Sequence, residues 1–150
     1  ELYRAIVELM KRWPELKVMC IPFSIPVKED LKTADNDLRL CQLLYAHLPR
    51  ELKTRFIIVR KRLTPMEALR LLSKLNCIVT LRYHPFIQAV KLGIHCIVIP
   101  HELKVYDYIN LVTSSRIFEN ADKVDVITLE SVSSHKFLEH FKKCLDAHVV

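Results

Sequence analysis

The sequence has only one glycine, Gly93, among its 150 residues. Glycine-rich phosphate-binding motifs such as GxGxxG and GxxxxGK are therefore excluded, and so is the GxSxG nucleophile turn. An HExxH pair is also absent from the sequence. Dinucleotide binding, P-loop hydrolysis, serine hydrolysis and zinc proteolysis consequently have no support in the sequence.

The cysteines also lack a recognisable spacing. No CxxC pair occurs among the five, which are Cys20, Cys41, Cys77, Cys96 and Cys144. We expect reduced core residues of an intracellular, cytoplasmic protein, because neither a zinc site nor a disulfide framework follows from this pattern. No apolar run reaches the roughly 18 residues of a membrane span. Because Glu1 opens the sequence without a methionine or a signal-like segment, we expect a piece of a longer polypeptide.

Apolar segments of two kinds alternate along the sequence. Runs typical of buried strands cover 17–25, 55–60, 77–81, 94–99 and 124–129. Helix-like segments lie over 2–13, 85–92, 105–112 and 131–148, with one more opened by Asp35 as N-cap and one by a capping box at Thr64. Strands that are apolar on both faces require helices on both sides. We therefore expect one domain over 1–150, with a Rossmann-like three-layer α/β/α fold and a parallel sheet of about five strands.

One short stretch carries the clearest functional signal. The run Val79 to Pro85 delivers Arg82 and His84 to the point where a strand ends and a helix begins, and Gly93 is expected to end that helix in the left-handed conformation. Helix N-termini present unpaired N–H groups and partial positive charge, and proline is favoured in a first turn. The stretch therefore predicts an anion site for phosphate or carboxylate.

A second polar loop follows the next strand, at His101, Glu102 and Lys104. Ligands of parallel sheets bind beyond the carboxyl ends of the strands, so we expect this loop and the Arg82 turn to share one rim. Such a set of side chains suits a small dianion or trianion. A plainer interpretation gives these residues no ligand. Arg82 would then pair with an acidic side chain at a helix start, and His84 would be a polar residue at the beginning of a helix. The second loop would be an exposed turn with no chemical role.

The segment Asn76–Val112 resembles the polysaccharide pyruvyl transferase family. The C-terminal half of that family carries a strand, an R-x-H motif, an alanine-containing helix, a glycine, a second strand, and a lysine before the next helix. The matching residues here are Arg82, His84, Ala89, Gly93 and Lys104. Looser similarity extends upstream to an aspartate that opens a helix, Asp35 or Asp37. The family commonly has a tyrosine and an aspartate before the lysine, where this chain has other residues.

The resemblance implies a reaction and a set of partners. Members look like two-domain GT-B enzymes that transfer a pyruvyl group from phosphoenolpyruvate to a sugar hydroxyl pair as a ketal. The chain would be the C-terminal half, with Arg82 on the donor's phosphate or carboxylate, His84 in donor binding or acid catalysis, and Lys104 as a second positive charge. The implied partners are phosphoenolpyruvate or another small phosphorylated anion, a glycan acceptor, and an N-terminal domain or a second copy. No cofactor and no metal are implied.

Two alternatives remain open at this point. The same rim would grip a diphosphate if the chain were the nucleotide-sugar-binding half of a GT-B glycosyltransferase, which would prefer UDP or GDP. Alternatively, the net charge of +6 and the basic residues Arg55, Arg60, Lys61 and Arg62 suit a non-catalytic module for anions or nucleic acid. Nucleic acid is the weaker partner, because no aromatic residues interleave with these charges and no known reader motif occurs.

Overall fold

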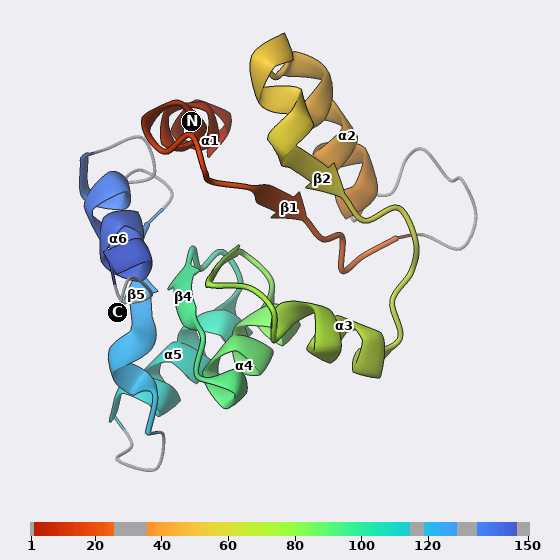
Figure 1. Cartoon of the computed structure of the whole chain (residues 1–150). Helices are drawn as coiled ribbons and strands as arrows, with labels where there is room; N and C mark the ends of the chain where they lie inside the picture. Colours follow the sequence, from red (N-terminus) through yellow and green to blue (C-terminus); the bar gives the residue numbers. More distant parts are fainter. Residues whose placement is uncertain (1, 26–35, 115–118, 129–134, 147–150) are drawn as a thin grey trace. The chain divides into compact units, whose positions relative to one another are not determined.

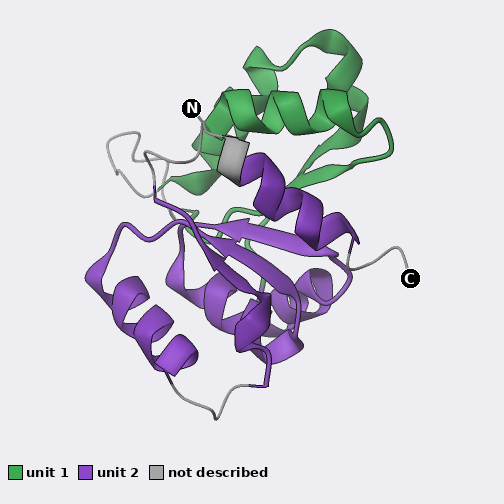
Figure 2. Ribbon diagram, turned by 90° about the vertical axis from the view of Figure 1, so that its left-hand side faces the viewer, with its two compact units in different colours: residues 1–63 green, residues 64–150 purple. Residues whose placement is uncertain are grey.

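The computed structural model describes residues 2–25, 36–114, 119–128 and 135–146 (Figure 1). The chain divides into two compact units, residues 1–63 and residues 64–150 (Figure 2). Strands and helices alternate within each unit, and neighbouring strands run parallel. The predicted α/β class is therefore confirmed, whereas the single domain over 1–150 stays a prediction.

The first unit contains two short strands between helices. Its elements in chain order are α1 (Leu2–Arg12), β1 (Val18–Cys20), α2 (Asp37–His47), a 3-10 helix η1 (Arg50–Arg55) and β2 (Phe56–Ile58). β1 pairs with β2 in parallel. A core of buried side chains, Met10, Leu48, Leu52 and Phe56, holds these elements together.

The second unit is built on three strands. Its elements are α3 (Pro65–Leu72), β3 (Cys77–Thr80), α4 (Tyr83–Leu92), β4 (His95–Val98), α5 (Leu103–Ser114), a 3-10 helix η2 (Ala121–Lys123), β5 (Val124–Val126) and α6 (His135–Asp146). The strands follow the order β3-β4-β5 and are all parallel. Figure 2 shows the helix that leads to the C-terminus, α6, on one face of this sheet, with α4 and α5 on the other.

The expectation of one five-stranded sheet is wrong, because the described strands form one sheet of two and one of three. The run predicted as a strand over 17–25 is a strand only over Val18–Cys20. Beyond it, the backbone N–H groups of Phe23 and Ser24 donate to the carboxylate of Asp37, 3.1 and 2.9 Å away. These amides therefore anchor the start of α2 instead of extending the sheet.

The expectation that all cysteines are reduced is also wrong. Cys20 at the end of β1 and Cys41 in α2 form a disulfide, with their Cα atoms 5.9 Å apart. The packing of α2 beside the first strand brings together two residues whose spacing in the sequence matches no motif. Cys77, Cys96 and Cys144 are free thiols, as predicted.

Arg55 has a structural role inside the first unit. Its guanidinium donates to the carbonyl oxygens of Met10, Trp13 and Leu16, at distances of 2.7 to 3.1 Å. These carbonyls lie at and just beyond the end of α1, where a helix has no internal partners for its C=O groups. Arg55 therefore stabilises the end of α1, and its charge is directed to the backbone.

The local signals for helix ends are mostly confirmed. Thr64 and Glu67 form the predicted capping box at the start of α3, and Gly93 ends α4 with a φ of 65°. α4 begins at Tyr83, two residues before the predicted start at Pro85, because Thr80 Oγ1 accepts from Arg82 N–H and turns the chain early. Asn36 caps α2; Asp35, the predicted cap, lies outside the described residues. None of the described helices combines the length and apolarity that crossing a bilayer requires.

Candidate functional site: a basic cluster at the ends of β3 and β4

The site lies where two neighbouring parallel strands end. Thr80 and Val98 are partners in the register of β3 and β4, and Ile99 N–H continues the ladder by donating to Thr80 O at 2.9 Å. The chain then turns into α4 after Arg82 and into α5 after Glu102. Both helices therefore begin at the same edge of the sheet, and the partial positive charge of each N-terminus is directed there.

Glu102 is the centre of a cluster of basic side chains. Lys104 Nζ lies 2.7 Å from Glu102 Oε2, while His101 Nε2 and Arg82 Nη1 lie 3.4 and 3.9 Å from Oε1. About a third of the Arg82, His101 and Glu102 side chains remains exposed, and Lys104 is more exposed. We call these four residues the rim cluster. It presents more positive than negative groups at a solvent-accessible strand end.

The electrostatics of the rim cluster act on Glu102. The hydrogen bond from Lys104 lowers the pKa of the Glu102 carboxyl most, and the charges of Lys104, His101 and Arg82 lower it further. Partial desolvation raises this pKa, but the basic groups outweigh that effect. Glu102 is therefore ionised at neutral pH and holds the basic side chains together.

Aromatic rings line one side of the rim cluster. Lys104 Nζ lies 6.0 Å from the ring centre of Tyr83, within the usual range of a cation–π contact. Tyr83 meets the ring of Tyr108 edge to face at 5.6 Å, and Tyr108 meets buried Phe86 at 5.2 Å. Desolvation raises the pKa of Tyr108. This stack supports the Lys104 side chain from the core outward.

The structure thus brings together four of the five predicted site residues. Arg82, His101, Glu102 and Lys104 form one group, which joins the two predicted loops at one rim. His84 is not part of these ion pairs; it is exposed on the first turn of α4, with its ring centre 5.7 Å from that of Tyr83. Arg82 also pairs with an acidic side chain at a helix start, as the plainer interpretation expected: the partner is Glu102, directly before α5.

Sequence reasoning missed the aromatic support. Tyr83 lies inside the stretch that carries Arg82 and His84, yet no role follows from its position in the sequence alone. Tyr108 packs against Tyr83 and Phe86 through edge-to-face ring contacts. The spacing of Lys104 and Tyr108, four residues apart at the start of α5, was the available signal that both share one helix face.

The arrangement has the chemistry of an anion site. Arg82, Lys104 and a protonated His101 supply charged donors, and two helix N-termini add backbone N–H groups. The carboxylate of Glu102 already lies among these donors. A phosphate or carboxylate ligand of similar geometry could therefore take its place. A single carboxylate surrounded by cations does not form a metal site.

Comparison with known proteins gives one positive result. The sequence model of a family described as polysaccharide pyruvyl transferase matches residues 3–102. The matched range includes Arg82, His84, His101 and Glu102 and ends two residues before Lys104. No curated protein and no solved structure matches the chain significantly. Because the family match covers well over half of the chain, including most of the rim, the chain belongs to the polysaccharide pyruvyl transferase family.

Proposed function

We propose that the rim cluster binds phosphoenolpyruvate, and that the chain takes part in moving its pyruvyl group onto a sugar hydroxyl pair as a ketal. The observation that carries this proposal is the convergence of Arg82, His101 and Lys104 on one carboxylate at the ends of β3 and β4. Membership of the family supports a transferase that acts on polysaccharides. The identity of the donor as phosphoenolpyruvate goes beyond family membership and is our own proposal.

The chemistry of the reaction explains why cations are needed. The methylene carbon of phosphoenolpyruvate takes up a proton, two sugar hydroxyls add to its C2 carbon, and inorganic phosphate leaves. Negative charge grows on the departing phosphate, so charged donors placed beside it lower the barrier. Arg82 and Lys104 serve this purpose, and the guanidinium of Arg82 suits a bidentate contact with phosphate or carboxylate.

The carboxylate of Glu102 occupies the place that we propose for the carboxylate or phosphate of the donor. In the absence of a ligand its carboxylate keeps Arg82, His101 and Lys104 gathered, which lowers the entropy cost of assembling them around phosphoenolpyruvate. On binding, the ligand takes over these contacts and Glu102 moves aside. Glu102→Gln removes the competing charge, so this variant binds phosphoenolpyruvate more tightly than the original chain.

His84 is the proposed proton donor. An imidazole changes its charge near neutral pH and is therefore suited to deliver a proton to the methylene carbon. Its exposed position on the first turn of α4 leaves it open to a substrate bound at the rim. His84→Gln should accordingly retain phosphoenolpyruvate binding and lose the chemical step.

Calorimetric titration at fixed, low salt tests the proposal, with phosphoenolpyruvate, UDP and GDP as separate ligands. We expect selective binding of phosphoenolpyruvate, weakened at least roughly tenfold by Arg82→Ala or Lys104→Ala, because each charge-assisted hydrogen bond is worth about 1.5–3 kcal/mol. Lys91→Ala is the matched control, since Lys91 is an exposed cation in the last turn of α4, at the opposite end from Arg82.

The outcomes separate the competing functions. If the chain prefers UDP or GDP, and this binding depends on Arg82 and Lys104, then the donor is a nucleotide sugar and not phosphoenolpyruvate. If Lys91→Ala weakens binding as much as Arg82→Ala does, the ligand is attracted by the overall positive charge of the chain and not by the rim cluster. An anionic-polymer function is disfavoured already, because Arg55 and Arg62 of its basic set donate to backbone carbonyls within the first unit.

A further inference from the structure

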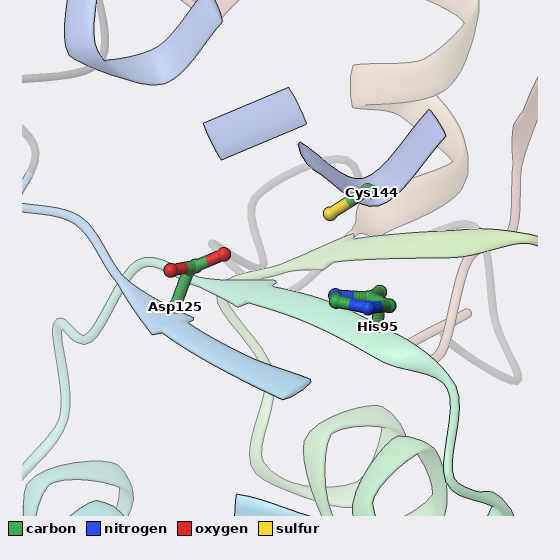
Figure 3. Close-up of side chains that lie close together, drawn as sticks. All are labelled: His95, Asp125 and Cys144. Atoms are coloured by element: carbon green, nitrogen blue, oxygen red, sulfur yellow. The ribbon is translucent and has the colours of Figure 1, made fainter. Parts of the chain in front are cut away.

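A second group of polar side chains lies on the opposite side of the β3-β4-β5 sheet from α4. One ligand atom each of His95, Asp125 and Cys144 lies within 4.8 Å of the others. Figure 3 shows His95 and Asp125 on neighbouring strands, with Cys144 reaching toward them from α6. We call these three residues the inner cluster. It involves the first residue of β4 and the middle residue of β5, and it shares no residue with the rim cluster.

The strand register explains why the inner cluster shares one face. Cys77 and His95 are partners across β3 and β4, and Asp125 on β5 is the partner of Ile97, two residues after His95. Side chains two residues apart in a strand, and partners across a parallel pair, point to the same side. This is the face on which α6 packs. The inner cluster is therefore a product of the fold.

The helix contributes two residues to the same place. His140 and Cys144 are four residues apart in α6, so they lie on one side of it. His140 Nδ1 lies 2.8 Å from Asp125 Oδ1. Cys77 adds a thiol that hydrogen-bonds Cys144. Five side chains of metal-binding type thus meet between the sheet and α6.

We propose that His95, Asp125 and Cys144 bind a zinc ion, with His140 holding the Asp125 carboxylate in position. One imidazole, one carboxylate and one thiolate are ligands that zinc favours over harder cations such as magnesium. Bonds of about 2.0 Å to nitrogen or oxygen and 2.3 Å to sulfur place tetrahedral ligand atoms roughly 3.5 Å apart. Small side-chain rotations therefore close the 4.8 Å group around an ion.

The surroundings of the inner cluster fit a bound cation. The Cys144 side chain is fully buried, and the side chains of Asp125 and His140 are only 24% and 27% exposed. A metal ion at this place would be partly shielded from bulk water, which strengthens its attraction to the carboxylate and to a thiolate. Carboxylates that bind a metal are usually held by hydrogen bonds from outer residues, and His140 is placed to do this for Asp125. Zinc would tie α6 to the two strands and stabilise the second unit.

The test uses the full 150-residue chain, stripped of metal by a chelator and kept without reductant so that the Cys20–Cys41 disulfide stays closed. Thiol titration first verifies that the three remaining cysteines are reduced. Cobalt(II) is then added as a spectroscopic probe of a zinc site. We expect one cobalt per chain, with a thiolate-to-cobalt charge-transfer band that added zinc abolishes by displacement.

The variants identify the ligands. Cys144→Ala should remove the charge-transfer band, and His95→Gln and Asp125→Asn should each weaken zinc binding by about tenfold or more. Cys96→Ala is the matched control: it also removes a buried thiol, but from the other face of β4. If circular dichroism shows that Cys144→Ala does not fold, His95→Gln carries the test. No stoichiometric binding to the original chain, or a band that survives both Cys144→Ala and His95→Gln, overturns the proposal.

Discussion

The rim cluster and the inner cluster differ in how the sheet builds them. The rim cluster gathers residues from the two loops that directly follow β3 and β4 and from the first turn of α5, and its side chains are partly open to solvent. The inner cluster gathers residues from within β4 and β5 and from α6, under the cover of that helix. According to our two proposals, the strand ends bind an exchangeable ligand, whereas the covered strand face holds an ion permanently.

The largest expected effect is that variants of one cluster lose one ligand and keep the other. The double variant Arg82→Ala/Lys104→Ala should lose about 100-fold or more in phosphoenolpyruvate affinity, because two charge-assisted hydrogen bonds are removed. Its zinc affinity should stay unchanged. Cys144→Ala should show the reverse pattern. Calorimetry with each ligand measures both affinities, and loss of both ligands in one folded variant would contradict two independent sites.

A second prediction concerns stability without metal. In the presence of a chelator, Asp125→Ala should lower the free energy of unfolding by about 1–3 kcal/mol, since it leaves half-buried His140 without its carboxylate. Glu102→Ala should cost clearly less than this, because the ion pairs of Glu102 lie at the surface and are screened by solvent. Urea unfolding measures both values. Equal costs would mean that burial does not distinguish the two clusters.

A third prediction concerns Gly93, which joins α4 to β4 and lies two residues before His95 of the inner cluster, at the end of β4 away from the rim cluster. Its φ of 65° is in the left-handed region, and an added Cβ would lie 3.0 Å from Asn120 Oδ1. Gly93→Ala should lower the free energy of unfolding by about 1–2 kcal/mol and disturb the inner cluster more than the rim cluster. Lys91→Ala, at an exposed position of the same turn, should change it little. Equal unfolding curves for Gly93→Ala and the original chain would show that this turn is not constrained.

The smallest expected effect is a titration. Because the basic neighbours lower the folded pKa of Glu102, this group stabilises the folded chain above its unfolded pKa. That contribution is lost as the pH falls through the lowered folded pKa. Carbon-13 NMR of the Glu102 carboxyl should give a pKa below the ordinary glutamate value, and Lys104→Ala should return it toward that value. An ordinary glutamate pKa for Glu102 in the original chain would mean that the basic side chains are not held close to its carboxylate.

The sequence predicted the rim because its residues are adjacent to recognisable boundaries. Arg82 and Lys104 each lie beside a strand end and a helix start, and the Thr64 capping box and Gly93 mark neighbouring turns. Such signals depend on a few consecutive residues, which local backbone chemistry determines. The family resemblance uses the same segment, and the match over residues 3–102 confirms it.

Contacts between distant residues were not predictable in this way. Cys20 and Cys41 form a disulfide although their spacing matches no motif, and Asp37 shortened a strand by binding amides in the preceding loop. The inner cluster draws on residues as far apart in the sequence as His95 and Cys144, and the one local sign was the four-residue spacing between Cys144 and His140, which contacts Asp125. Such sites depend on strand register and helix packing, which become known only when the chain is folded.

The most direct test of the rim as the donor site is a phosphoenolpyruvate titration followed by NMR on the isotope-labelled chain. We expect chemical-shift changes at the side chains of Arg82, His101 and Lys104 and at the first backbone amides of α4 and α5. The signals of His95, Asp125 and Cys144 should stay in place. Changes centred on the first unit, or on the inner cluster, would contradict the assignment of the donor to the rim.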